Sequence, residues 1–71
     1  METIKISVTC VGQKSCEVVA YRPEKSLWCY NVDPSSGLWN VTHIPTGKFV
    51  FEKLDEDSAN HLCESMHNLY N

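Results

Sequence analysis

The stretch Gly37–Phe51 constrains the fold most, because two short alternating segments flank a tight turn within it. Pro45 fixes the φ that the second position of a type I turn needs. Gly47 can adopt the left-handed conformation that closes a three-residue loop with a bulge. The sequence therefore predicts a β-hairpin, with strands over about 38–44 and 48–53.

A three-residue loop also fixes which residues of this hairpin lie opposite one another. It places His43 opposite Phe49 and Val41 opposite Phe51. Side chains alternate between the two faces of a strand, so these four residues and Trp39 are expected to share one face. A four-residue loop would set both Phe side chains opposite polar residues, and we therefore expect the three-residue loop.

Three further strands are predicted before the hairpin. Strict alternation of apolar and polar residues predicts a strand over about 3–10, followed by a turn at 11–14. Segments rich in β-branched and aromatic residues predict strands over about 15–22 and 26–32. The loop at 33–37 leaves the register of the next pairing open between two alternatives. One aligns Cys29 with Val41, and the other, shifted by one residue, aligns Trp28 and Tyr30 with Val41 and Trp39.

The chain is predicted to end in a helix over about 56–70. Asp55 is a good N-cap, because its side chain can accept hydrogen bonds from free backbone N–H groups. Apolar residues then recur at three- and four-residue spacing in one stripe: Ala59, Leu62, Cys63, Met66, Leu69 and Tyr70. With short connections throughout, we predict an α+β fold in a single domain over 1–71, an antiparallel four- to five-stranded meander with one C-terminal helix packed on one face.

One helix can cover only one face of this sheet, yet the second and third strands carry apolar side chains on both faces. These are Val18, Ala20, Leu27 and Cys29 against Val19, Tyr21, Trp28 and Tyr30. Either the sheet curls strongly or the surplus face contacts another molecule. We favour contact with another molecule, because aromatic residues are enriched at interface hot spots.

The charge pattern bears on the class of partner. The net charge is −3, and the six Lys and Arg residues are scattered singly along the chain. Binding of nucleic acid relies on clustered cations, so it is disfavoured, including base stacking on an aromatic sheet face. Five of the nine acidic residues lie in 52–64, and a DNA-mimicking inhibitor of a nucleic-acid enzyme is one alternative hypothesis.

The beginning of the chain shows no basic-then-apolar leader, and no apolar run approaches the ~20 residues that a membrane helix needs. We therefore expect a cytoplasmic protein with no membrane contact. Four cysteines, at positions 10, 16, 29 and 63, lack the Cys-x-x-Cys spacing of zinc ribbons. In a reducing cytosol we expect buried thiols rather than disulfides.

Cysteine and histidine suggest a further alternative, a small metal-binding or catalytic domain. Cys63 and His67 stand four residues apart on the predicted helix, and Cys29 and His43 are neighbours in one register. No glycine-rich oxyanion loop or nucleophile elbow accompanies them, so we expect no enzyme, no metal and no cofactor. His43 is expected to bond the turn backbone and to pack on Phe49.

The segment 39–47, Trp-Asn-Val-Thr-His-Ile-Pro-Thr-Gly, followed by an apolar strand and a capped helix, resembles a pattern of small phage and prophage accessory proteins. The resemblance covers about residues 38–66 and carries over no catalytic residue. It implies a location in the host cytoplasm and action by binding and blocking a host protein, such as a defence nuclease.

The leading hypothesis is thus a small non-catalytic protein-binding module. Its partner would be a host protein or a second copy of the chain in a homodimer. The residues expected to bind the partner are Trp28, Tyr30, Trp39, Tyr21, Glu56 and Asp57.

Overall fold

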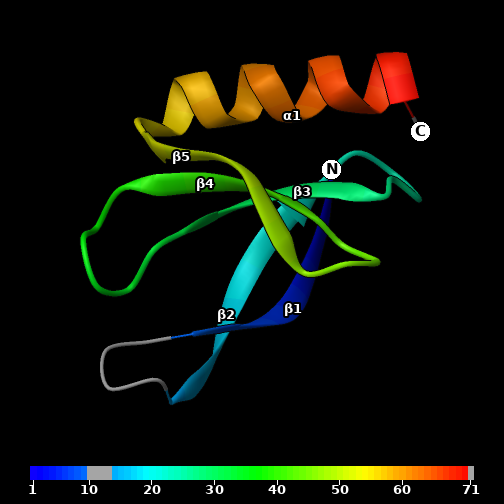
Figure 1. Ribbon diagram of the computed structural model, residues 1–71. Coiled ribbons are helices and arrows are strands. Elements are labelled where there is room, and N and C mark those ends of the chain that lie inside the picture. The colour runs from blue at the N-terminus through cyan, green and yellow to red at the C-terminus, as the bar shows by residue number, and fades with distance from the viewer. Residues whose placement is uncertain (10–13, 71) are drawn as a thin grey trace.

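The computed structural model of the protein describes residues 1–9 and 14–70. Its elements are β1 (Glu2–Thr9), β2 (Ser15–Arg22), β3 (Trp28–Val32), β4 (Trp39–His43), β5 (Lys48–Leu54) and α1 (Glu56–Tyr70). The strands pair antiparallel in the order β1-β2-β3-β4-β5, and α1 packs on this sheet (Figure 1). The predicted α+β meander with a C-terminal helix is therefore confirmed. The expected end of the first strand at residue 10 and most of the turn at 11–14 lie outside the described residues.

The start of α1 follows the predicted capping. The Asp55 carboxylate accepts a hydrogen bond of 2.7 Å from the backbone N–H of Ser58. This bond to the backbone, with a further one to the Ser58 side chain, lowers the pKa of Asp55. Glu56 and Asp57 occupy the first turn, where the helix dipole favours negative charge. The cap fixes the point at which the chain leaves β5 and turns back over the sheet.

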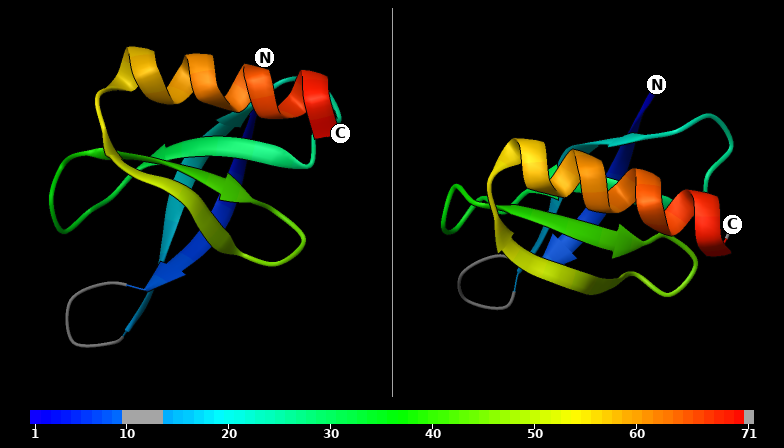
Figure 2. Two further views of the ribbon diagram at one scale, coloured as in Figure 1. Left: turned by 45° about the horizontal axis from the view of Figure 1, so that its top comes forward. Right: turned by 90° about the horizontal axis from the view of Figure 1, so that it is seen from above.

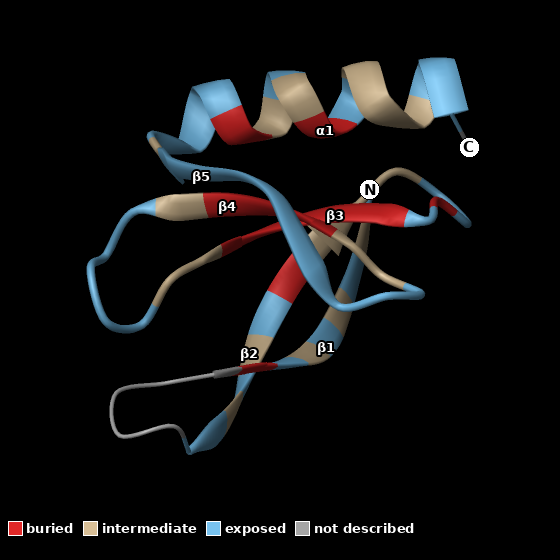
Figure 3. Cartoon of the chain, in the orientation of Figure 1, coloured by how far each residue is buried: buried red, intermediate tan, exposed pale blue. Residues whose placement is uncertain are grey.

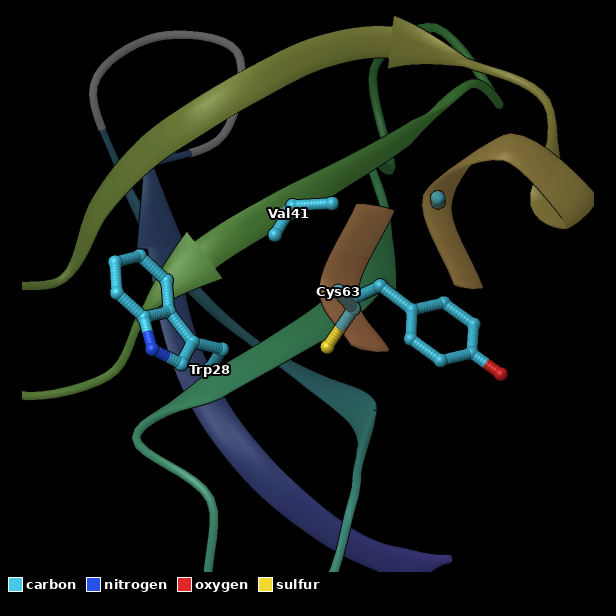
Figure 4. Packing of buried hydrophobic residues seen from close by; sticks show 5 residues of the cluster. Trp28, Val41 and Cys63 are labelled. Atoms are coloured by element: carbon cyan, nitrogen blue, oxygen red, sulfur yellow. The ribbon is translucent and has the colours of Figure 1, made fainter. Parts of the chain in front are cut away.

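The main core lies between α1 and the middle strands. Figure 2 shows the helix lying across the sheet, and Figure 4 shows part of the cluster beneath it. Its buried members are Trp28, Tyr30, Val41, Ala59 and Cys63, with Tyr21, Trp39, Leu54, Leu62 and Met66 packed around them. In the last helical turn, Leu69 and Tyr70 are 70% and 65% exposed, although the Tyr70 ring still approaches that of Trp28. The predicted apolar stripe is therefore well covered only as far as Met66.

The face of β3 and β4 that points away from α1 is also buried (Figure 3). Side chains alternate between the two faces of a strand, so four residues of β3 and β4 point away from the helix. All four are at most 2% exposed: Cys29, Asn31, Asn40 and Thr42. The Thr42 hydroxyl donates to Asn31 Oδ1 at 3.0 Å within this layer. The other strands must supply this cover, so the sheet curls over its own far face. Curling was the alternative that the sequence analysis ranked second.

The β4–β5 hairpin departs from the predicted register near its turn. Val41 lies opposite Phe51 as expected, but His43 lies opposite Lys48 and Thr42 opposite Phe49. The loop is thus four residues long, 44–47, rather than three. Because opposite residues share a face, Phe49 lies on the face of Thr42 and not with Val41, contrary to the prediction.

Two irregularities in β5 reconcile this loop with the pairing further along the strand. Seven residues of β5 span five residues of β4, with register shifts on both sides of Val41. One extra residue falls between Phe49 and Phe51, and the other lies between Phe51 and Leu54. Lys53 in the second interval has a φ of 59°, in the left-handed region. Such bulges bend a strand and increase its twist, so β5 curves along the edge of the sheet.

The β3–β4 pairing follows neither of the two registers that the sequence left open. Tyr30 lies opposite Val41 and Trp28 opposite His43. The Asp33 N–H donates to the Leu38 carbonyl at 2.6 Å, which shortens the loop. Trp28 and Tyr30 nevertheless share the face of Val41, as the shifted alternative placed them, and this face is the one that α1 covers.

Candidate functional site

Three of the residues predicted to bind a partner form one aromatic cluster. The ring centroid of Tyr30 lies 5.5 Å from that of Tyr21 and 5.5 Å from that of Trp39. Tyr21 and Trp39 stack at 6.2 Å. Antiparallel pairing of β2, β3 and β4 brings the three rings together, since Tyr21 lies opposite Tyr30. Tyr30 is buried, whereas Tyr21 and Trp39 each keep part of their surface in solvent.

Trp28, from the same predicted set, lies apart from this cluster. Its ring packs 4.6 Å from the ring of His43 and 6.4 Å from that of Tyr70, near the end of α1. His43 also bonds the Thr46 side chain through Nδ1 at 2.9 Å, so it ties the turn but packs on Trp28 and not on Phe49. Trp28 is 8% exposed and Tyr30 is 7% exposed. Both rings contribute mainly to the core.

The helix adds carboxylates beside the aromatic cluster. Glu56, Asn60 and Glu64 follow one another at four-residue spacing and therefore lie along one side of α1. Burial raises the pKa of the Tyr30 hydroxyl, and the negative charges of Glu56 and Glu64 act in the same direction. Glu56 precedes Ala59 by about one helical turn and Glu64 directly follows Cys63, and both Ala59 and Cys63 pack in the cluster that contains Tyr30. We call Tyr21, Tyr30, Trp39, Glu56, Asn60 and Glu64 the aromatic corner.

Asp57, the last residue of the predicted set, points to a different region. It lines an open hollow of about 470 Å³ between the end of β5 and the first turns of α1. The hollow is lined by Leu54, Asp57, Ser58, His61 and Leu62. The structure thus separates the two acidic residues that the sequence analysis grouped together.

The sequence analysis did not identify the exposed apolar side chains of β5 as a surface. Phe49, Val50 and Phe51 are 38%, 39% and 37% exposed, and they are consecutive. β5 has β4 as its single neighbour, so these residues lie on an edge strand. Three adjacent apolar residues in the last strand of a meander are the signal that could have found them. We call them the β5 apolar strip.

Two of the cysteines, Cys29 and Cys63, lie in the protein interior. Cys29 and Cys63 are free and fully buried, and burial raises their pKa values to about 11 and about 12. Both thiols are therefore protonated at neutral pH, which makes them weak nucleophiles. Within residues 1–9 and 14–70, no group of three potential metal ligands comes together. Cys16 is disulfide-bonded, contrary to the expectation of thiols alone.

Among the helices of the described chain, none is long and apolar enough to cross a membrane. Comparison with protein-family models, with curated proteins and with solved structures finds no significant match. Two surfaces are therefore the candidates for function, the β5 apolar strip and the aromatic corner.

Proposed function

We propose that the protein is a small non-catalytic binding module that contacts another protein through the β5 apolar strip. The observation that supports this proposal is the exposure of three consecutive apolar residues of an edge strand, with Phe49 on one face of the sheet and Phe51 on the other. Adjacent apolar side chains in water are costly, at about 25 cal/mol for each Å² of apolar surface. Such patches are found at sites where another molecule covers them.

The resemblance to phage and prophage accessory proteins extends this proposal to a biological role. On that analogy, the module acts in the host cytoplasm and blocks or modulates a host protein, such as a defence nuclease. A disulfide at Cys16 is unusual for a reducing cytosol, so the compartment rests on the analogy alone. A second copy of the chain is the other partner considered, and sedimentation equilibrium separates the two cases.

The test compares capture from bacterial lysate by three versions of the protein as bait. The β5 variant is Phe49→Ser with Phe51→Ser, and the control is Leu69→Ser, which changes an apolar residue 70% exposed at the end of α1. We expect a protein retained by the wild type and by the control to be lost with the β5 variant. Equal retention by all three, with all three folded by circular dichroism, would overturn the proposal.

A further inference from the structure

We propose that the aromatic corner binds an arginine side chain of the partner protein, with the guanidinium stacked on the open surface of Tyr21 and Trp39 and bonded to the carboxylates of α1. This inference rests on the proposed binding function and names the chemistry of a second contact. It concerns a different set of residues from the β5 apolar strip.

The rings define where the cation would lie. Centroid separations of 5.5 to 6.2 Å mean that the three rings are already in contact, so no cation fits between them. Tyr30 is buried below, while Tyr21 and Trp39 are partly exposed and present aromatic surface outward. The face of an aromatic ring carries negative potential and attracts cations, with Trp the strongest. The accessible position is therefore on top of the cluster.

Charge complementarity selects a cation. Glu56 and Glu64 are exposed, and neither makes an ion pair with another described residue. Two cations of β1 and β2 are already paired, since Lys5 lies 3.7 Å from Glu17 and Arg22 lies 2.8 Å from Glu2. The corner thus combines aromatic rings with two exposed carboxylates that make no ion pair within the described chain.

Hydrogen-bonding capacity favours arginine over lysine. Glu56 and Glu64 are exposed and offer carboxylate acceptors beside a flat aromatic surface. A guanidinium is planar and has five N–H donors, so it can stack on a ring and donate sideways at the same time. An ammonium group lacks this flat shape.

The experiment titrates the ¹⁵N-labelled full chain with the peptide acetyl-Gly-Arg-Gly-amide and follows the indole N–H of Trp39 by NMR. The same peptide with citrulline is the neutral control of equal shape. The titration is run at low salt, where ion pairs are screened least. We expect a saturable shift of Trp39 and Tyr21 with the arginine peptide and a much weaker one with citrulline.

Variants locate the charge that matters. Glu56→Gln with Glu64→Gln should weaken arginine binding roughly two- to thirty-fold, the range for two exposed ion pairs. Glu24→Gln with Glu52→Gln changes the net charge equally at exposed sites elsewhere and should leave binding unchanged. Equal binding of the arginine and citrulline peptides, or equal weakening by both variant pairs, would overturn the inference.

The two proposals fail separately. If capture depends on the β5 apolar strip but the arginine peptide leaves Trp39 unmoved, the inference is wrong and the binding function stands. If the peptide binds at Trp39 but capture ignores β5, the site is real and the proposed role of β5 is wrong.

Discussion

The buried hydroxyl of Thr42 gives the sharpest test of the layer on the far face of the sheet. Thr42 is 2% exposed, and its Oγ1 donates to Oδ1 of Asn31, which is fully buried. Replacing Thr42 by Val keeps the shape but leaves the Asn31 oxygen without this donor. A buried acceptor that loses its partner costs about 1–3 kcal/mol. The added methyl group returns about 0.8 kcal/mol of burial.

The net expectation for Thr42→Val is a loss of roughly 0.5–2 kcal/mol in the free energy of unfolding. A domain of 71 residues has a total stability of about 4–10 kcal/mol, so this loss is measurable by urea denaturation. At roughly 4–8 °C for each kcal/mol, the Tm should fall by about 2–16 °C.

Thr42→Ser is the matched control, because it keeps the donor and removes one methyl group. If the hydroxyl is what matters, Thr42→Val with Asn31→Ala should cost less than the sum of the two single changes. A Thr42→Val protein as stable as the wild type would refute the buried hydrogen bond and, with it, the closure of the far face.

Two further predictions concern the titrating groups. The thiols of Cys29 and Cys63, with pKa values raised to about 11 and about 12 by burial, should resist a water-soluble thiol reagent at pH 8 and react once urea unfolds the chain; rapid reaction in buffer would contradict their burial. The hydrogen bond from Arg22 lowers the pKa of Glu2 in the folded protein, so this pair stabilises the fold above the unfolded pKa and loses its contribution as pH falls through the folded value. Glu2→Gln should therefore flatten the decline of Tm below about pH 5, whereas Glu24→Gln, exposed and nearby, should keep the wild-type profile.

The order and type of the elements could be read from the sequence because each carries a strong local signal. Alternation of apolar and polar residues predicts β1. The capping residue Asp55 and the apolar residues at three- and four-residue spacing predict α1 and its first residue. Short connections leave an antiparallel meander as the simplest arrangement. These signals depend on nearest neighbours along the chain, and that is why they were sufficient.

The register of β5 could not be read in the same way. Strict alternation from Phe51 predicts that Phe49 lies with Val41, but an extra residue between the two Phe side chains moves Phe49 to the other face. A bulge inserts a residue without changing the composition of the strand, so the apolar pattern does not reveal it.

Tyr21, Tyr30 and Trp39, three of the residues predicted to bind a partner, form one cluster of rings in the structure, and their role in binding stays a prediction. Trp28 belongs to the same sheet face, but its position beside His43 at the far end of α1 depends on the β3–β4 register, which the sequence left open. The rings that Trp28 contacts, those of His43 and Tyr70, are distant from it in the chain.

The two kinks in β5 have a consequence for how this protein behaves in a crowded solution. A regular edge strand with three adjacent apolar residues would allow identical molecules to pair edge to edge and form fibrils. Two bulges, one on each side of Phe51, interrupt the regular spacing of backbone N–H and C=O groups that such pairing requires. Lys53, with its left-handed backbone, lies in the second bulged interval. The bulges therefore hinder backbone pairing of β5 with another strand. Phe49, Val50 and Phe51 stay exposed for contacts made by side chains alone.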